Sequence, residues 1–122
     1  MKILIVDDSR AMRMIVKRTL RQAGFGDHTM EEAFNGADAL NKIDAAHPDL
    51  VLCDWHMPEM TGIELLQTIQ SSKRSVRLGF VTSQGTPDMR KRAKDAGALF
   101  LIAKPFTVDA FRETLSKYLS AT

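Results

Sequence analysis

The chain has 122 residues, of which 44% are hydrophobic and 26% charged, and its formal net charge at pH 7 is +2. This length suits one domain with a sizeable core, the composition excludes a disordered chain, and the charge is too small to indicate a nucleic-acid-binding protein by itself. No apolar run approaches membrane-spanning length, and the first predicted strand begins too early to leave room for a signal peptide. The single cysteine, Cys53, excludes an intrachain disulfide. We therefore expect one domain over residues 1–122, located in the cytoplasm.

The first half of the chain predicts two strands, each followed by a helix. A nearly continuous apolar run at 3–6 is typical of a strand buried on both faces. Helical spacing follows over 9–23, with Ser9 as a plausible N-cap. After a turn near Phe25, we expect a weaker strand at 28–33 and a helix at 35–45.

The second half predicts three more pairs of strand and helix. Strands are expected at 50–53, 78–81 and 99–103, and helices at 62–71, 87–96 and 107–119. The helix at 87–96 offers only Met89, Ala93 and Ala96 for burial, so we expect it to be weakly docked. Five alternations of strand and helix indicate an α/β fold, in which a parallel sheet is covered by helices on both faces.

Four predicted strands end in polar residues. The strand at 3–6 runs into Asp7 and Asp8, and the strand at 50–53 runs into Asp54. The other two run into Thr82-Ser83 and Lys104-Pro105. Because the carboxyl ends of parallel strands share one edge of the sheet, these groups are expected to converge there. Taken alone, Asp7 and Asp8 favour an acidic turn in which Asp8 or Ser9 caps the next helix.

The carboxylates at this edge indicate chemistry on a phosphoryl group. Neighbouring carboxylates repel unless a cation neutralises them, and Mg²⁺ accepts a few such ligands. Asp54 beside the cation would be placed to act as a nucleophile that forms an aspartyl phosphate. Thr82 would donate a hydrogen bond to a phosphoryl oxygen, and Lys104 would supply a positive charge.

The motifs at these strand ends resemble those of the receiver domains of two-component response regulators. The stretches that carry the resemblance are Ile5-Val6-Asp7-Asp8, Asp54-Trp55-His56-Met57-Pro58-Glu59-Met60-Thr61-Gly62, Val81-Thr82-Ser83 and Lys104-Pro105-Phe106. The resemblance covers essentially the whole chain and is strongest to stand-alone chemotaxis receivers. It implies a flavodoxin-like (βα)5 three-layer sandwich with a five-stranded parallel sheet in the order 2-1-3-4-5.

The resemblance also implies a role for each site residue. A histidine kinase or a phosphotransfer domain would donate the phosphoryl group to Asp54. Its oxygens would be bound by Thr82, Ser83, Lys104 and the backbone amide of Trp55. The expected ligands of Mg²⁺ (or Mn²⁺) are Asp7, Asp8, Asp54 and the backbone carbonyl of His56. Thr82 and residue 101 would form the switch that changes partner binding, with a flagellar motor switch as a candidate target.

One residue departs from the family pattern. The mobile aromatic that usually stands three residues before the lysine is Leu101 here. A leucine has no ring or hydroxyl to reorient, so the usual switch cannot operate unchanged. Phe100 is adjacent, but strand alternation directs it to the other face of the sheet.

Several alternatives remain open from the sequence. The chain fits a phosphorelay shuttle, a phosphate sink or a receiver excised from a larger regulator. A small phosphatase with an aspartate nucleophile is an alternative of another class, although His56 stands where such enzymes usually have a second aspartate. We expect no enzymatic activity beyond self-phosphorylation and autodephosphorylation. We also expect a monomer that binds neither membrane nor nucleic acid, with the basic residues of helix 9–23 forming a solvated face.

Overall fold

The computed structural model, which describes residues 1–119, contains one parallel sheet of five strands. The strands are β1 (Lys2–Val6), β2 (Thr29–Ala33), β3 (Leu50–Cys53), β4 (Arg77–Thr82) and β5 (Leu101–Ala103). Their order across the sheet is β2-β1-β3-β4-β5, and all four neighbouring pairs are parallel. The predicted fold class and strand order are confirmed.

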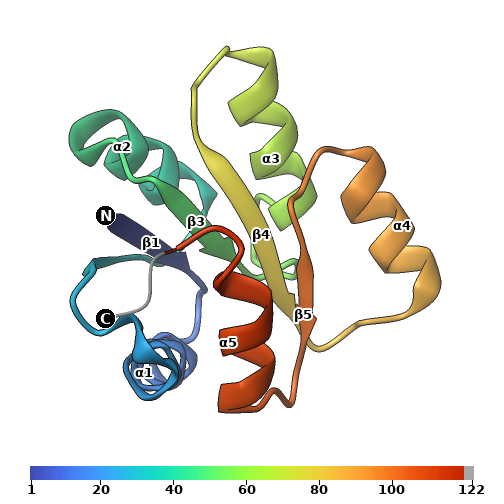
Figure 1. Cartoon of the computed structure of the whole chain (residues 1–122). Helices are drawn as coiled ribbons and strands as arrows, with labels where there is room; N and C mark the ends of the chain where they lie inside the picture. The colour runs from blue at the N-terminus through green and yellow to red at the C-terminus, as the bar shows by residue number, and fades with distance from the viewer. Residues whose placement is uncertain (120–122) are drawn as a thin grey trace.

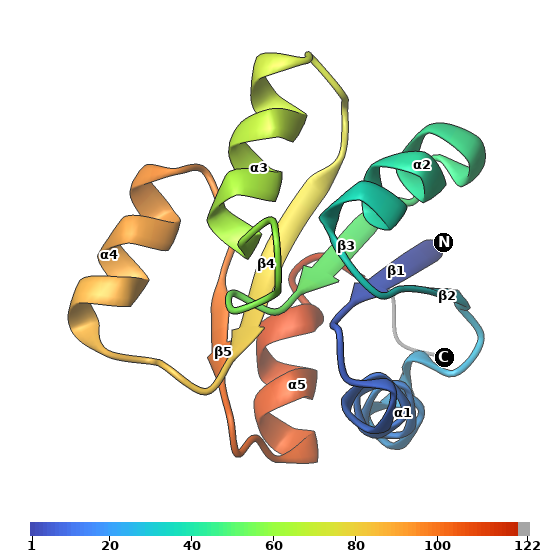
Figure 2. The same cartoon turned by 180° about the vertical axis from the view of Figure 1, so that it is seen from behind.

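Five α-helices cover the two faces of the sheet. They are α1 (Arg10–Leu20), α2 (Gly36–Ala46), α3 (Gly62–Ser71), α4 (Pro87–Asp95) and α5 (Val108–Leu115). Helices α1 and α5 lie on one face, and α2, α3 and α4 lie on the other (Figures 1 and 2). Within residues 1–119, no helix combines the length and apolar character needed to cross a membrane.

The sheet separates two hydrophobic layers. Alternate residues of the central strands point to opposite faces, so Leu52 belongs to the layer under α1 and α5, whereas Cys53 belongs to the layer under α2, α3 and α4. Phe25 and Phe111 are completely buried aromatics of the first layer, and Phe80 is a completely buried aromatic of the second. Burial on both faces explains why these strands are continuous apolar runs rather than alternating ones.

Each helix begins at a residue whose side chain accepts a backbone N–H from its first turn. The five N-cap residues are Ser9, Asn35, Thr61, Thr86 and Thr107. Such caps satisfy N–H groups that have no partner within the helix, and they fix where the chain turns from loop to helix. The structure therefore confirms the predicted cap at Ser9, which sets the start of α1 directly after the two aspartates.

Three predicted boundaries were wrong by two residues or more. Helix α1 ends at Leu20 and is followed by a π-helical turn, η1 (Arg21–Phe25), in which Gly24 has a φ of 99°. Strand β5 begins at Leu101 rather than at residue 99. Helix α5 ends at Leu115, yet Leu119 is still buried in the layer beneath it. The apolar spacing indicated which residues are buried, but not where the helical hydrogen bonds stop.

Helix α4 is the least anchored of the five α-helices, as predicted. Its only fully buried residue is Ala93, and Met89 packs partly against the core. The guanidinium of Arg92 lies 5.5 Å from the ring centroid of Trp55, so a cation–π contact adds to the small apolar anchor. Little apolar area therefore holds α4 to the sheet.

Candidate functional site

Three carboxylates meet at the carboxyl edge of β1 and β3. The backbone N–H of Asp7 donates to Ala33 in β2, and the N–H of Asp54 donates to Val6 in β1, at 3.1 and 2.9 Å. The sheet pairing thus continues one residue past β1 and β3, which places Asp7 and Asp54 side by side. Each of Asp7, Asp8 and Asp54 offers an oxygen atom within 4.8 Å of the others.

The carboxylate cluster fits a divalent cation. Asp7 is buried, Asp54 is partly buried and Asp8 is exposed, so the cluster is fixed on one side and open to solvent on the other. Hard cations such as Mg²⁺ bind a few carboxylate oxygens and keep several water molecules, which this open side leaves room for. A ring of three acidic groups also has a net charge that a cation would offset.

Lys104 contacts the same cluster from the end of β5. Its Nζ lies 3.3 Å from Asp7 Oδ2 and 3.7 Å from Asp54 Oδ1. The backbone N–H of Lys104 donates to Thr82 across the β4–β5 pair at 2.7 Å, which fixes the start of the side chain. The ammonium therefore reaches two of the three carboxylates from the side opposite β2.

The surroundings of Asp54 act on its protonation in opposite directions. Burial raises the pKa of the Asp54 carboxyl above its ordinary value, and the nearby charge of Asp7 adds to this effect. The charge of Lys104 lowers the pKa, as do hydrogen bonds from the backbone amides of Trp55 and His56. The net pKa is raised, so the ionised Asp54 costs folding free energy when no cation is bound.

The substitution Asp54→Asn is therefore expected to stabilise the metal-free protein at pH 7, with Tm rising by about 3 °C. The wild-type charge is unfavourable at neutral pH, and the penalty disappears as pH falls through the folded pKa toward the ordinary value of 3.8. Calorimetry of both proteins from pH 7 to pH 4 should show the two Tm values converging. Asp27→Asn, on an exposed turn, is the control. A variant less stable than wild type at pH 7 would contradict this explanation.

The loop after β3 lies closely over the site. Gly62 donates its N–H to the carbonyl of Trp55 at 2.8 Å. A Cβ at Gly62 would lie 2.5 Å from the carbonyl oxygen of Asp54, so only glycine fits this close approach. The loop residue His56 is exposed, as predicted for a residue expected to act through its backbone.

The backbone of Trp55 belongs to the site, because its amide donates to Asp54, but its side chain lies in the core. Only 3% of Trp55 is accessible to solvent. Its ring packs on Phe80, with 4.8 Å between ring centroids, and lies under Arg92 of α4. The burial has a physical reason, because α4 supplies few large apolar residues and the indole fills the space beneath it.

Two hydroxyl residues lie at the end of β4, where Thr82 is the last residue of the strand and Ser83 the first after it. Thr82 is fully buried, and its Oγ1 accepts a hydrogen bond from the N–H of Gln84 at 3.4 Å. Ser83 and Gln84 are exposed. Because β4 pairs with both β3 and β5, Thr82 lies at the same edge of the sheet as Asp54 and Lys104. The convergence predicted from the four strand ends is thus present.

Residues 100 and 101 point to opposite faces, as strand alternation predicts. Leu101 packs partly against the layer under α2, α3 and α4. Phe100 packs against the other layer, where the centroid of its ring lies 5.5 Å from that of Tyr118. The ring occupies the space that a Cβ at Gly79 would need. Phe100 therefore does not replace the missing aromatic at position 101.

Arg13 was not assigned a site role from the sequence. It donates from Nη1 to the backbone carbonyl of Asp7, and its Nε contacts Glu32 Oε1 at 3.0 Å. The bond to a carbonyl six residues earlier depends on how the first loop bends, so no residue spacing could have indicated it. Arg13 ties α1 to the end of β1 and thereby supports the position of Asp7.

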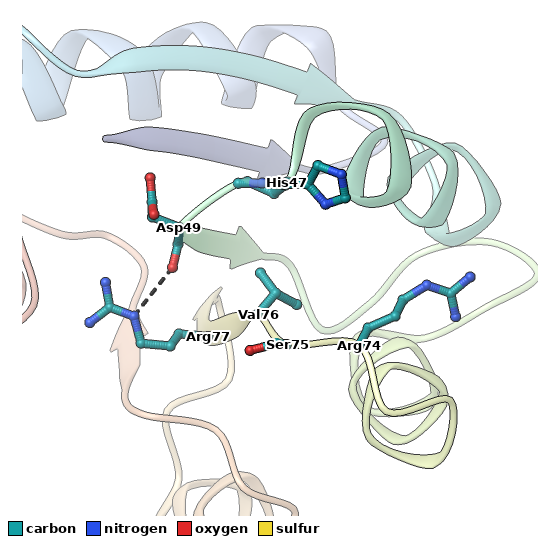
Figure 3. A pocket seen from close by; sticks show the side chains of 7 residues that line it. His47, Asp49, Arg74, Ser75, Val76 and Arg77 are labelled. Atoms are coloured by element: carbon teal, nitrogen blue, oxygen red, sulfur yellow. Dashed lines mark hydrogen bonds between the residues drawn. The ribbon is translucent and has the colours of Figure 1, made fainter.

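A polar hollow of about 470 Å³ lies at the opposite edge of the sheet, far from the carboxylates. The residues lining it are His47, Pro48, Asp49, Arg74, Ser75, Val76 and Arg77. Its arginines point in opposite directions, and Arg77 donates to the carbonyl of Asp49 (Figure 3). Arg74 pairs with Asp44. These cations are therefore engaged by the protein itself, and the hollow adds nothing to the chemistry of the carboxylate edge.

Known proteins are similar to this chain in both sequence and fold. The family model for the response regulator receiver domain matches residues 3–116. The sporulation initiation phosphotransferase F of Bacillus subtilis is 37% identical, over 97% of this chain and 93% of that protein. The chemotaxis protein CheY of Pseudomonas aeruginosa is 39% identical, over 96% of this chain and 94% of that protein. A solved structure of Vibrio cholerae CheY4 superimposes with a TM-score of 0.83 at 32% identity, covering 97% and 98% of the two chains.

Proposed function

We propose that this chain, which belongs to the response regulator receiver domain family of two-component systems, accepts a phosphoryl group on Asp54. The donor would be a phosphohistidine on a histidine kinase or a phosphotransfer domain. The observation that supports this function best is the convergence of Asp7, Asp8 and Asp54 with Lys104 at one edge of the sheet.

The site would bind Mg²⁺ (or Mn²⁺) through Asp7, Asp8, Asp54 and the carbonyl of His56. When bound, the cation would offset charge on the phosphoryl oxygens, where most catalysis of this transfer lies. A carboxylate oxygen of Asp54 would attack phosphorus while the phosphorus–nitrogen bond of the donor breaks. The amide of Trp55, which donates to Asp54, would remain available to a phosphoryl oxygen at the same place.

Three further residues would bind the phosphoryl group. Lys104 already contacts Asp54 and would follow the new negative charge. Thr82 would exchange its hydrogen bond with Gln84 for one to a phosphoryl oxygen, and the exposed Ser83 would complete the set. The movement of Lys104 and the exchange at Thr82 both leave the strand register unchanged. The reaction consumes one phosphoryl group per chain, so we propose no enzymatic turnover of a separate substrate.

Two outputs of the phosphorylated state fit the chain. The resemblance to chemotaxis proteins supports docking to a downstream protein, with a flagellar motor switch as one candidate. Leu101 favours the second output, in which the phosphoryl group is passed on in a relay, because that function does not need an aromatic switch. One relative is itself named a phosphotransferase of sporulation initiation. We place both outputs in the cytoplasm.

The test is stoichiometric phosphorylation by a small acyl phosphate with Mg²⁺ present. Intact-mass measurement should show a gain of one phosphoryl group in the wild type and none in Asp54→Asn. Chelation of the cation should prevent the gain. Incorporation into Asp54→Asn at the wild-type rate would refute the assignment. Many turnovers per chain on an aryl phosphate would instead indicate the aspartate-nucleophile phosphatase.

A further inference from the structure

An arginine of α4 bridges two backbone carbonyls that belong to different parts of the chain. Arg90 Nε donates to the carbonyl of Gly85 in the β4–α4 loop at 3.1 Å. Its Nη1 donates to the carbonyl of Leu101 in β5 at 3.0 Å. A planar guanidinium has donors in a fixed fork, so it holds two acceptors in a defined relative position.

The acceptor on β5 lies on the open side of an edge strand. Strand β5 pairs only with β4, and the carbonyl of Phe100 accepts from Phe80 N–H within that pair. Successive carbonyls of a strand alternate in direction, so the carbonyl of Leu101 points away from β4. Arg90 therefore satisfies an edge group that the sheet leaves without a strand partner.

The acceptor in the loop is held close to the same strand. A Cβ at Gly85 would lie 2.7 Å from the Cβ of Ala103, so the loop rests directly on β5. One residue earlier, the N–H of Gln84 donates to Thr82 Oγ1. The loop is thus tied at one end to Thr82 and at the other, through Arg90, to Leu101.

These contacts matter because α4 has a small apolar anchor. Ala93 is its only fully buried residue, so the first turn of α4 depends on the polar contacts of Arg90 for its position beside β5. The leucine side chain at 101 offers no polar group, whereas its backbone carbonyl does. Arg90 makes a connection to residue 101 that does not depend on the side chain there.

We propose that Arg90 is a positioning residue that latches the β4–α4 loop and the first turn of α4 to β5 in the unphosphorylated protein. This inference rests on the proposed function, because it names what opposes the switch at that site. When Thr82 turns to a phosphoryl oxygen, Gln84 loses its acceptor, and the Arg90 bridge is then the main polar contact that keeps the loop on β5. The free energy needed to break the Arg90 bridge is therefore part of the free energy needed to reach the phosphorylated arrangement.

The test is a titration of beryllofluoride, a phosphoryl mimic, with Mg²⁺ present, followed by the fluorescence of Trp55, the only tryptophan. Arg90→Met should lower the half-saturating concentration about fivefold, because two hydrogen bonds no longer favour the unliganded arrangement. Arg90→Lys keeps the charge but not the fork and should give a smaller decrease. Lys94→Met removes the same charge from an exposed position of α4, and its half-saturating concentration should match that of the wild type.

An Arg90→Met affinity equal to that of Lys94→Met, or weaker than it, would overturn the latch. Gly85→Ala provides a second approach, since its methyl group would lie 2.7 Å from Ala103 Cβ and 3.2 Å from Arg90 Nη2. It would therefore displace the loop from both β5 and the guanidinium, and it too should tighten binding. Amide exchange of Gln84 in the metal-free protein tests the latch without any ligand and should be faster in Arg90→Met than in Lys94→Met. If wild type does not respond to beryllofluoride, the proposed function fails, and the exchange rates still decide the latch.

Discussion

Lys104→Met is expected to bind Mg²⁺ about tenfold more tightly than the wild type while accepting phosphoryl groups roughly 100-fold more slowly. The ammonium lies within 4 Å of Asp7 and Asp54, and all three side chains are largely shielded from solvent. At an effective dielectric constant of 20, two unit charges about 4 Å apart interact by about 4 kcal/mol. Solvent screening and desolvation reduce this to the tenfold effect expected here.

The two effects have opposite signs because Lys104 repels one species and attracts another. Its charge would compete with a cation for the carboxylates, whereas it would stabilise the phosphoryl oxygens as the group arrives. Calorimetric titration with Mg²⁺ and intact-mass kinetics with an acyl phosphate measure the two separately. Lys117→Met, on an exposed position, controls for the change in net charge. Equal losses of metal affinity and phosphorylation would show that Lys104 acts only by holding the site together.

Phe80→Ala is expected to lower the free energy of unfolding by about 3–5 kcal/mol. The ring is completely buried, packs on Trp55, and would lie 2.7 Å from a Cβ at Gly62. Its removal leaves a cavity directly beneath the loop that supplies amides to Asp54. A loss of this size is a large fraction of the stability of a domain of this length, and denaturant titration measures it.

The milder pair Phe80→Leu and Phe111→Leu separates stability from site geometry. Both rings are fully buried, but Phe111 lies in the layer under α1 and α5, on the far side of the sheet from Trp55. We expect similar losses of stability from the two variants and slower phosphorylation only for Phe80→Leu. Equal phosphorylation rates would mean that Phe80 supports the sheet and not the loop.

The sequence predicted the fold and the site where local chemistry decides the structure. Apolar runs that end in Asp7, Asp54, Thr82 and Lys104 define both the strands and their carboxyl ends, so one pattern predicted architecture and convergence together. The start of a helix could also be predicted, because a capping side chain such as Ser9 acts within one turn. The family confirmed by comparison is the one that these same strand ends resembled.

The remaining features depend on contacts between distant segments. The side chain of Trp55 is buried because α4 supplies few large apolar residues to cover the sheet, and His28, in the turn before β2, is buried beside Phe25. The contact of Arg90 with Leu101 joins residues that are adjacent only after β5 has paired with β4. No spacing rule connects such pairs, so they appear only in three dimensions.

The buried position of the single cysteine allows unfolding of the protein to be measured through the reactivity of its thiol. Cys53 lies in β3 at the centre of the sheet, is fully buried, and donates from Sγ to the carbonyl of Asp54. Burial raises the pKa of the Cys53 thiol well above its ordinary value, so little reactive thiolate exists in the folded protein. Alkylation must therefore wait for the central strands to separate. The rate of alkylation therefore measures how often the protein unfolds. Any ion or partner that binds at the neighbouring Asp54 and stabilises the folded state will lower this rate.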